Sequence, residues 1–417
     1  MKTILYLSPY SAFPARYGGA MRINNLCREV SRQYQVMHFA QRVQRDQVAF
    51  SLAPVIQQIT PNYIEYSSRN PLNTLLYGAA CRTLKIPPFL QSEVLGITSP
   101  QWLHKQLQTA SIVNVEHPWQ FLWVYRQVVT RKPIVVTAHN VEADLCIADD
   151  MNIPRPLANF LMRDAERREA FAMRYAARIF TTSAEDINSL VERYNVPPQK
   201  CVIIPNGVDC KIFMPVTPTI RQERKQALGL ADRCVVVFSG STHQPNREAV
   251  QQIIDWLDYW SSDLVHFLII GSIGRAFTHI KHPQITFTGL VEDTRPYSEA
   301  ADIAINPMIS GSGTNLKQVE YMAMGLPSIA TPVGARGIGL VDGTHGYICS
   351  LQDFPAKLRW LVQQPEIYGE IGRNARLFVE KTFDWMVIGQ KVVSAYHELE
   401  AESSTTVLEN REKSFLS

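Results

Sequence analysis

The residue types best suited to chemistry lie in one glycine-rich turn, which precedes Lys317 and Glu320. Residues without bulky side chains let backbone N–H groups approach phosphate oxygens, and the amino end of a helix adds about half a positive charge. Lys317 would add a full charge in the first helical turn. Glu320 lies on the same helix face and suits the two hydroxyls of a ribose. The turn comprises Gly311, Ser312, Gly313, Thr314, Asn315 and Leu316.

These residues predict a phosphate-binding turn, although an ordinary strand–helix turn with a Lys–Glu ion pair would have the same residues. A dinucleotide fingerprint requires a small residue where Leu316 stands and usually occurs at the first βα turn of its domain. A Walker loop requires Gly-Lys-Ser/Thr, and a metal chelate on a diphosphate would be indicated by Asp-x-Asp; the chain contains neither. We therefore expect backbone amides and cationic side chains, without a metal ion, to hold the phosphates.

The elements that must position this turn follow a regular pattern. Short apolar, β-branched runs alternate with stretches of helical period, which is typical of βα units and a parallel sheet. A first series of strands is expected at residues 4–7, 35–39, 112–115, 134–138, 179–182 and 202–205. A second series is expected at residues 235–239, 266–270, 285–288, 303–307 and 328–331.

The two series predict two doubly wound domains. Residues 213–222 combine prolines and threonines without periodicity, which indicates a linker. We therefore expect an N-terminal domain over residues 1–215 and a C-terminal domain over 216–383. A helix over 384–400 should pack back on the N-terminal domain, and 401–417 should form a polar, frayed tail. Tandem domains of this class bind ligands in a shared cleft at the carboxyl ends of their strands.

Composition narrows the class of protein. The chain has 417 residues, of which 46% are hydrophobic and 19% charged, as in globular proteins. A net charge of +3 is too small for a protein whose main partner is a nucleic acid. Seven cysteines without paired Cys/His spacing argue against a disulfide framework or a zinc site.

Localisation follows from the same composition. No apolar stretch approaches the roughly 20 residues of a membrane span. The thiols and the absence of a signal-like segment predict a cytoplasmic protein. Residues 1–215 have an excess of basic residues, which is compatible with peripheral contact at the inner face of a membrane. Scattered, solvated arginines would give the same excess of basic residues.

The order of the motifs resembles that of the retaining glycosyltransferases of family 4, which have the GT-B fold of two Rossmann-like domains facing a central cleft. Residues 14–22, with Gly18 and Gly19, are similar to the family's Gly-Gly loop on the donor phosphates. Residues 137–142 resemble its His-Asn-x-Glu segment, and residues 205–209 have the sequence Pro-Asn-Gly-Val-Asp of its interdomain turn. The resemblance covers residues 2–400.

One departure from the family concerns its Glu-x7-Glu motif. Glu320 matches the second acid, which holds the ribose in the family, but Ser312 stands in place of the first. The first acid contacts hydroxyls of the donor sugar. Its replacement removes that contact and leaves the choice of donor sugar open.

A second departure lies after the first strand of the C-terminal domain. The common pattern has a Gly-Arg pair and a following Lys on the diphosphate, whereas Ser241 and Asn246 hold those places after Gly240. Lys317 and Arg247 would supply the displaced charge. Because this variant is a recurrent branch of the family, relocated contacts are favoured over a loss of activity. The resemblance thus implies these donor-binding residues: Gly18, Gly19, Gly240, Ser241, Asn246, Arg247 and the turn from Gly311 to Leu316.

The resemblance also implies roles at the reacting centre. It places His139 beside the anomeric carbon, with a hydrogen bond to the donor sugar or the reacting hydroxyl, although a capping or core histidine is the alternative. Glu142 would orient the acceptor or merely begin the next helix. Aromatic faces near His117 would stack on sugars or form a packed patch. The implied catalytic residues are His139, Lys317 and Glu320, and the implied acceptor-binding residues are Arg22, His117, Trp119 and Glu142.

The function implied is transfer of a sugar from a nucleoside diphosphate sugar to an acceptor hydroxyl with retention of configuration. UDP is favoured over GDP because UDP-sugars are the commoner donors. No cofactor other than the donor substrate is expected. The acceptor would be a sugar, a lipid-linked glycan or a small metabolite. The alternatives are a non-catalytic GT-B partner subunit, indicated by the missing acid, and a sugar-nucleotide epimerase or hydrolase.

Overall fold

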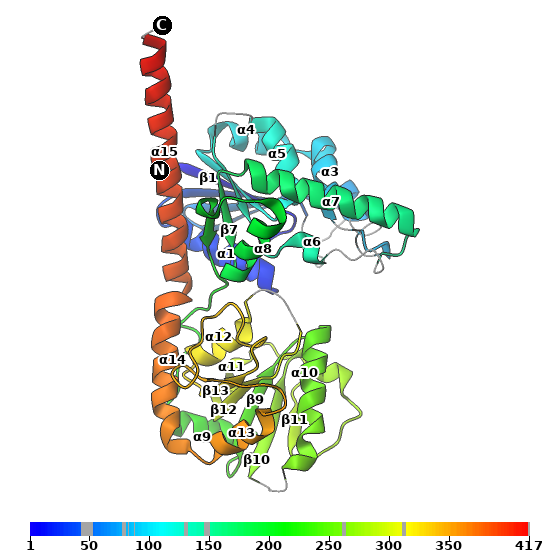
Figure 1. Ribbon diagram of the computed structural model, residues 1–417, viewed down its shortest axis with the longest axis vertical. Coiled ribbons are helices and arrows are strands. Elements are labelled where there is room, and N and C mark those ends of the chain that lie inside the picture. Colours follow the sequence, from blue (N-terminus) through cyan, green and yellow to red (C-terminus); the bar gives the residue numbers. More distant parts are fainter. Residues whose placement is uncertain are drawn as a thin grey trace. The chain divides into compact units, whose positions relative to one another are not determined.

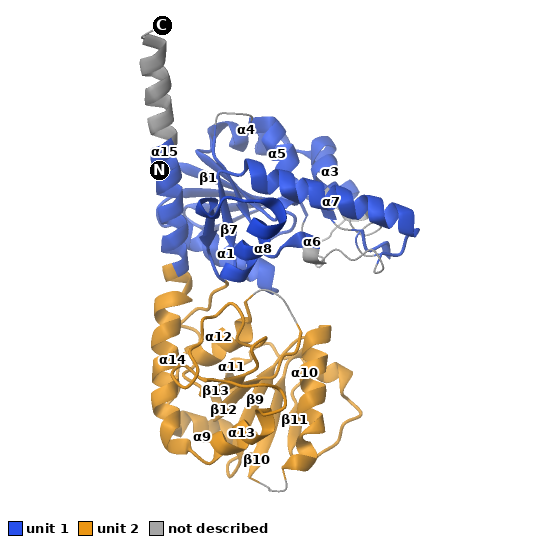
Figure 2. Ribbon diagram, in the orientation of Figure 1, with its two compact units in different colours: residues 1–205, 388–417 blue, residues 206–387 orange. Residues whose placement is uncertain are grey.

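The structure is a computed structural model that describes residues 1–42, 53–76, 81, 83–86, 88–128, 132–145, 151–260, 264–310 and 314–415. The chain forms two compact units, residues 1–205 with 388–417 and residues 206–387 (Figure 2). The expected boundary near residue 216 falls inside the second unit, because Val208 and Cys210 already belong to that unit's hydrophobic core.

Unit 1 contains an eight-stranded sheet in the order β3-β4-β2-β1-β5-β6-β7-β8. Every pair of neighbouring strands is parallel except β3 and β4. The order changes direction between β1 and β5, where doubly wound folds bind ligands. The strands are β1 (Thr3–Ser8), β2 (Gln35–Ala40), β3 (Val55–Thr60), β4 (Tyr63–Ser67), β5 (Ile112–Glu116), β6 (Ile134–Thr137), β7 (Arg178–Thr181) and β8 (Cys201–Ile203).

Helices flank this sheet (Figure 1). The α-helices are α1 (Gly18–Val30), α2 (Pro71–Leu76), α3 (Gln91–Thr98), α4 (Gln101–Thr109), α5 (Phe121–Val128), α6 (Glu142–Leu145), α7 (Arg155–Tyr175) and α8 (Ala184–Tyr194). Short 3-10 turns are η3 (Pro88–Leu90), η4 (Pro118–Gln120) and η6 (Pro198–Lys200).

Unit 2 contains a six-stranded, all-parallel sheet in the order β11-β10-β9-β12-β13-β14, which changes direction between β9 and β12. Its strands are β9 (Cys234–Ser239), β10 (Val265–Ile270), β11 (Ile285–Phe287), β12 (Ile303–Asn306), β13 (Ser328–Ala330) and β14 (Tyr347–Ile348). Its helices are α9 (Pro218–Ala227), α10 (Gln244–Asp255), η7 (Leu257–Tyr259), η8 (Ser272–Ala276), α11 (Arg295–Glu299), α12 (Leu316–Ala323), α13 (Phe354–Val362), η9 (Pro365–Ile367) and α14 (Tyr368–Thr382).

The last helix, α15 (Trp385–Phe415), begins in unit 2 and from Ile388 belongs to unit 1. Within unit 1 its Tyr396 hydroxyl lies 2.7 Å from the hydroxyl of Tyr6 in β1. The polar composition of residues 401–417 predicts a frayed tail, but the helix continues to Phe415. Glu, Leu, Lys and Arg dominate its last turns, and all four are good helix formers.

All the expected strands are present, with small shifts at their ends, and the expected α/β class with two parallel sheets is confirmed. The strands could be predicted because a parallel sheet covered on both faces has continuously apolar strands. Ile4, Leu5 and Leu7 of β1, for example, are fully buried.

Candidate active site

In unit 2 the expected donor-binding side chains gather where the strand order changes direction. Lys317 lies in the first turn of α12, which follows β12. Its ammonium nitrogen donates to Asn246 Oδ1 at 2.6 Å and lies 4.2 Å from the ring centre of Phe238. Asn246, in the first turn of α10, donates in turn to the carbonyl oxygen of Ser241 at 3.0 Å. The turns that follow β9 and β12 are thereby joined through Lys317.

The titratable pair of this turn is held in an unusual state. Burial lowers the pKa of Lys317 to about 7, against the opposing effect of Glu320. Burial raises the pKa of Glu320 to about 7, against the opposing effect of Lys317. A negatively charged group beside Lys317 would restore its full positive charge, because an opposite charge favours the ionised form. The site is therefore electrostatically suited to an anion.

The backbone around Gly240 explains why a glycine stands there. A Cβ atom at this position would lie 2.9 Å from Cγ of Asn246, so only glycine lets the amino end of α10 come this close. Ser241 is exposed. Arg247 is also exposed, and its Nε donates to the carbonyl oxygen of Thr242 at 3.0 Å.

The glycine-rich turn is described only at its end. Gly311, Ser312 and Gly313 lie outside the described residues. Thr314 is buried, Asn315 is the N-cap residue of α12, and Leu316 is its first helical residue. The helix thus begins where the sequence predicts it.

In unit 1, Gly18 and Gly19 form the start of α1. A side chain at Gly19 would overlap the hydroxyl group of Tyr10, so this glycine allows the tyrosine to lie under the helix start. The Tyr10 hydroxyl lies 3.2 Å from Nε2 of His117. Tyr10 was not predicted as a site residue, because nothing in the local sequence distinguishes it from a core tyrosine.

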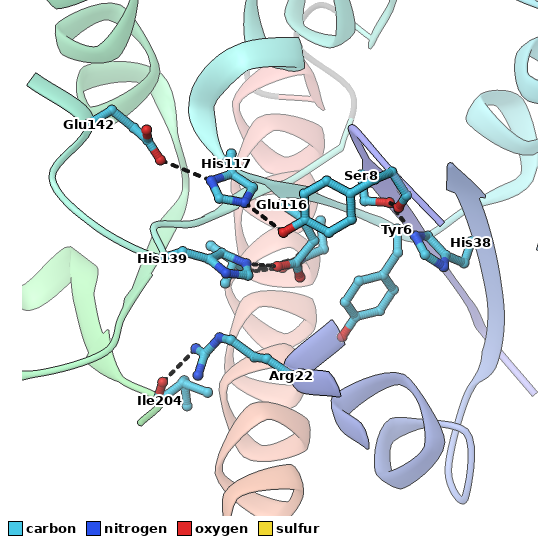
Figure 3. A network of polar contacts seen from close by, with 12 residues as sticks. Tyr6, Ser8, Arg22, His38, Glu116, His117, His139, Glu142 and Ile204 are labelled. Carbon is cyan, nitrogen blue, oxygen red and sulfur yellow. Dashed lines mark hydrogen bonds and ion pairs between the residues drawn. The ribbon is translucent and has the colours of Figure 1, made fainter. Parts of the chain in front are cut away.

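Both ring nitrogens of His117 have hydrogen-bond partners, and two other rings stack on it. Its Nδ1 lies 2.9 Å from Oε1 of Glu142. Its two faces stack on the rings of Trp119 and His139, with ring centres 4.3 Å and 4.1 Å away. Figure 3 shows the Glu142 side chain pointing toward the His117 ring. Because a carboxylate only accepts, Nδ1 carries the proton, and Nε2 accepts from the Tyr10 hydroxyl.

His139 follows β6 and pairs with a different carboxylate. Its Nε2 lies 2.6 Å from Oε2 of Glu116, the last residue of β5 (Figure 3). The side chain of Glu116 is fully buried and that of His139 is 9% exposed. Burial lowers the pKa of His139 to about 4, and the neighbouring His117 adds to this. Glu116 was not predicted, although a glutamate at the end of an apolar strand is an available signal.

Two of the implied acceptor-binding residues have other bonds. Arg22 is buried and donates to the carbonyl oxygens of Ile204 and Pro205 at 2.5 and 2.7 Å, so it holds the segment that leaves β8. Glu142 begins α6, and its own backbone N–H donates to Glu169 Oε1 at 2.8 Å. The structure thus brings His117, Trp119, Glu142 and His139 together, with Arg22 held at β8.

The described residues lack a metal-binding cluster and a membrane-spanning helix. They contain no group of three His, Cys, Asp or Glu side chains that could hold a metal ion. None of the helices they form is long and apolar enough to cross a membrane.

Comparisons with known proteins agree with this architecture. The family model "Glycosyltransferase Family 4" matches residues 17–212, and the model "Glycosyl transferases group 1" matches residues 233–364. These matches lie in the two sheet-containing parts of the chain, and the chain belongs to the family 4 glycosyltransferases.

Individual relatives are distant. A D-inositol 3-phosphate glycosyltransferase of Geodermatophilus obscurus is 24% identical over 292 residues, which are 63% of this chain and 61% of that protein. This chain therefore matches about three fifths of that relative's length.

Solved structures give the fold. Sucrose-phosphate synthase of Thermosynechococcus elongatus superposes with a TM-score of 0.71 at 16% identity, over 96% of this chain and all of that chain. The Anabaena protein HepE in complex with UDP gives a TM-score of 0.67 at 15% identity, over 95% of this chain and all of that chain. The protein has the GT-B fold.

Proposed function

We propose that the protein transfers a sugar from a nucleoside diphosphate sugar to an acceptor hydroxyl, with retention of configuration, in glycan, glycoconjugate or metabolite biosynthesis. The observation that carries this proposal is the site of unit 2, where Lys317 and Asn246 join the turns after β9 and β12. A diphosphate is the ligand that this combination of a helix start and a partly buried ammonium group fits best. Membership of the glycosyltransferase family supports the reaction class.

The reaction follows from where charge develops. Departure of the diphosphate builds negative charge on its oxygens while the sugar becomes cation-like, so preorganised positive potential at the leaving group lowers the barrier. Lys317 and the backbone amides at the start of α12 supply that potential. In front-face attack an oxygen of the leaving phosphate accepts the proton of the acceptor hydroxyl, and the new glycosidic bond forms on the face that the phosphate leaves. Glu320 would hold the ribose.

UDP is the favoured nucleotide of the donor, and GDP is the alternative. The structurally similar HepE was solved in complex with UDP. The relative from Geodermatophilus obscurus is named for D-inositol 3-phosphate, which makes small phosphorylated polyols one acceptor class to test first. We expect the reaction to need no metal ion and no further cofactor.

The experiment begins with binding. UDP and GDP are titrated calorimetrically into the purified protein, and a panel of nucleotide sugars is then screened for hydrolysis or transfer by mass spectrometry. We expect one nucleoside diphosphate to bind and one donor sugar to be consumed without added metal. Absence of binding by both nucleotides would refute the assignment of the site.

The second candidate is a non-catalytic GT-B subunit that binds a nucleotide or a partner protein. It is favoured by Ser312, which stands where the family has its first acid. Binding of a nucleoside diphosphate with no turnover of any donor, with or without acceptors, would support this candidate. Turnover of a donor to an epimer or a free sugar alone would instead indicate an epimerase or a hydrolase.

We further propose a cytoplasmic location with peripheral membrane contact through unit 1. The support is the excess of basic residues in the first half of the chain and the exposure of Leu157 and Phe160 on α7. A membrane surface would bring a lipid-linked acceptor to the protein.

A further inference from the structure

A chain of buried hydrogen bonds connects the C-terminal helix to His139. The hydroxyl of Tyr396 in α15 donates to Oδ1 of Asn114 in β5 at 3.2 Å. The amide nitrogen of Asn114 donates to Oε1 of Glu116 at 2.9 Å. The other carboxylate oxygen, Oε2, lies 2.6 Å from Nε2 of His139. Asn114, Glu116 and Tyr396 are fully buried, so each partner in this chain is fixed by the packing of unit 1.

The ionisation of Glu116 sets the direction of its bond to His139. Burial by itself raises the pKa of the Glu116 carboxyl, but the hydrogen bond from His139 and the positive charge of Arg22 outweigh it, and the pKa is lowered. An ionised carboxylate can only accept hydrogen bonds. Nε2 of His139 must therefore carry the ring proton, which leaves a lone pair on Nδ1.

The groups around His139 oppose a second proton on its ring. The ring of His117 is stacked on it at 4.1 Å, and Arg22 places a positive charge nearby. Glu116 is the carboxylate that faces it, while Glu142 is bonded to His117. Burial and the positive charge of Arg22 keep the His139 ring neutral at pH 7.

The two stacked histidines therefore differ in what they can offer a ligand. Both ring nitrogens of His117 are occupied, by Glu142 and by Tyr10. His139 has a bond only at Nε2, and within the described part of the chain nothing bonds to its Nδ1. Among the contacts of the described residues, Nδ1 of His139 is thus the acceptor atom of this imidazole pair that is left unoccupied.

We propose that Glu116 is a positioning residue that holds His139 as the neutral Nε2–H tautomer, so that Nδ1 accepts a hydrogen bond from a substrate hydroxyl. The hydroxyl class rests on the proposed glycosyl transfer, whereas the tautomer is a property of the free protein. Asn114 donates to the Glu116 carboxylate and is itself held by Tyr396. The C-terminal helix therefore helps to fix the orientation of the Glu116 carboxylate and, through it, of the His139 ring.

The tautomer can be measured without any substrate. The full-length protein is labelled with ¹⁵N-histidine, and two-bond ¹H–¹⁵N correlation spectra are recorded at pH 7. The His139 signals are assigned by their loss in His139→Gln. We expect a protonated Nε2 and an unprotonated Nδ1. A ring protonated at Nδ1, or at both nitrogens, would overturn the proposal, and this wild-type measurement requires no variant at Glu116 to fold.

Glu116→Gln tests the role of the carboxylate. Its amide can donate to Nε2 of His139 and thereby move the ring proton to Nδ1, so we expect a substantial fraction of the other tautomer. Glu142→Gln is the matched control, because it changes the partner of His117 and should leave the His139 signals in place. An unchanged His139 tautomer in Glu116→Gln would overturn the proposal.

Kinetics then connect the tautomer to the reaction. Once a donor is known, we expect Glu116→Gln to lower kcat at least tenfold while the affinity for the free nucleoside diphosphate, held by residues of unit 2, stays unchanged. An unaltered kcat would overturn the proposed role of Nδ1. If the wild-type protein transfers no sugar at all, the proposed function fails while the tautomer measurement still decides the role of Glu116.

Discussion

At the scale of single residues, Lys317 is the group on which the proposed reaction most depends. Replacement by alanine removes the cation that stabilises the departing diphosphate, and we expect Lys317→Ala to lower kcat/KM by more than tenfold, about 1.4 kcal/mol of transition-state stabilisation. Glu320→Ala should have a loss of similar size through the ribose. Lys211→Ala, at an exposed position of unit 2, is the control and should be neutral. Wild-type kinetics in both site variants would contradict the assignment.

The pKa of Lys317 gives a second prediction, on pH. In the free protein this group loses its charge as the pH rises through about 7, whereas a bound diphosphate raises its pKa. The terminal phosphate of UDP is fully ionised above pH 7, since its second pKa is about 6. UDP affinity should therefore fall by up to about tenfold per pH unit above 7, with uptake of one proton.

Calorimetry between pH 6.5 and 9, in buffers of different ionisation enthalpy, measures both the affinity and the proton uptake. Lys317→Met should abolish the pH dependence, and Glu320→Gln should retain it, which separates the ammonium from the carboxyl group. A wild-type affinity that does not change between pH 7 and 9 would show that Lys317 does not take up a proton on binding.

The site residues differ in how far the sequence could predict them. Lys317 and Glu320 could be proposed from the sequence, because a glycine-rich turn before a helix is a local pattern whose chemistry depends on neighbours in the sequence. Their role in the site stays a prediction. The pairing of Glu116 with His139 could not be proposed in this way, since it arises from the register of two strands that sets Glu116 beside Thr137, two residues before His139. Only the three-dimensional structure brings such distant residues into hydrogen-bond distance.

At the scale of elements, the position of α12 depends on a close approach by α14. A Cβ atom at Gly372 of α14 would overlap the carbonyl oxygen of Gly325, just beyond the end of α12, and that oxygen belongs to rigid backbone. We expect Gly372→Ala to lower the free energy of unfolding of unit 2 by about 1–3 kcal/mol, the usual cost of overpacking. The measurement is thermal or urea unfolding.

Gly369→Ala is the matched control on the same helix. There, in the first turn of α14, a Cβ atom would meet only the flexible end of Arg373, and alanine has a higher helix propensity than glycine. We expect this control to be neutral or stabilising. Equal effects of the two substitutions would mean that the contact between α14 and Gly325 does not limit the packing.

The strands were predicted unequally for a physical reason. The strands other than β3, β4 and β14 are mostly apolar runs and were all found. The pair β3 and β4 was missed because Gln57, Gln58 and Glu65 break the apolar run, as expected for strands near a sheet edge. The strand β14 has two residues and gives no periodic signal.

At the scale of the whole molecule, the sequence predicted two domains and placed their boundary near residue 216 from the composition of a proline-rich segment. The segment that precedes it packs in unit 2, where Arg376 donates to the carbonyl oxygens of Cys210 and Phe213 at 2.7 and 2.5 Å. The second half of the expected linker is also helical, because α9 begins at Pro218. A composition rich in proline and threonine therefore did not mark the boundary between the two units.

The charge of the molecule leads to a last prediction, on membrane binding. The start of α7 exposes Leu157 (47%) and Phe160 (61%), and Arg163 is exposed one turn further along the helix. Arginine side chains attract anionic headgroups, and a fully inserted apolar side chain contributes about 1.5–3 kcal/mol.

We expect the protein to sediment with vesicles that contain anionic phospholipid, and less so at high salt, because salt screens the electrostatic part. Phe160→Ser should reduce the bound fraction several-fold, while Ile220→Ser, at an exposed position of unit 2, should leave it unchanged. Equal sedimentation with purely zwitterionic vesicles, or equal effects of the two substitutions, would contradict a docking role for α7.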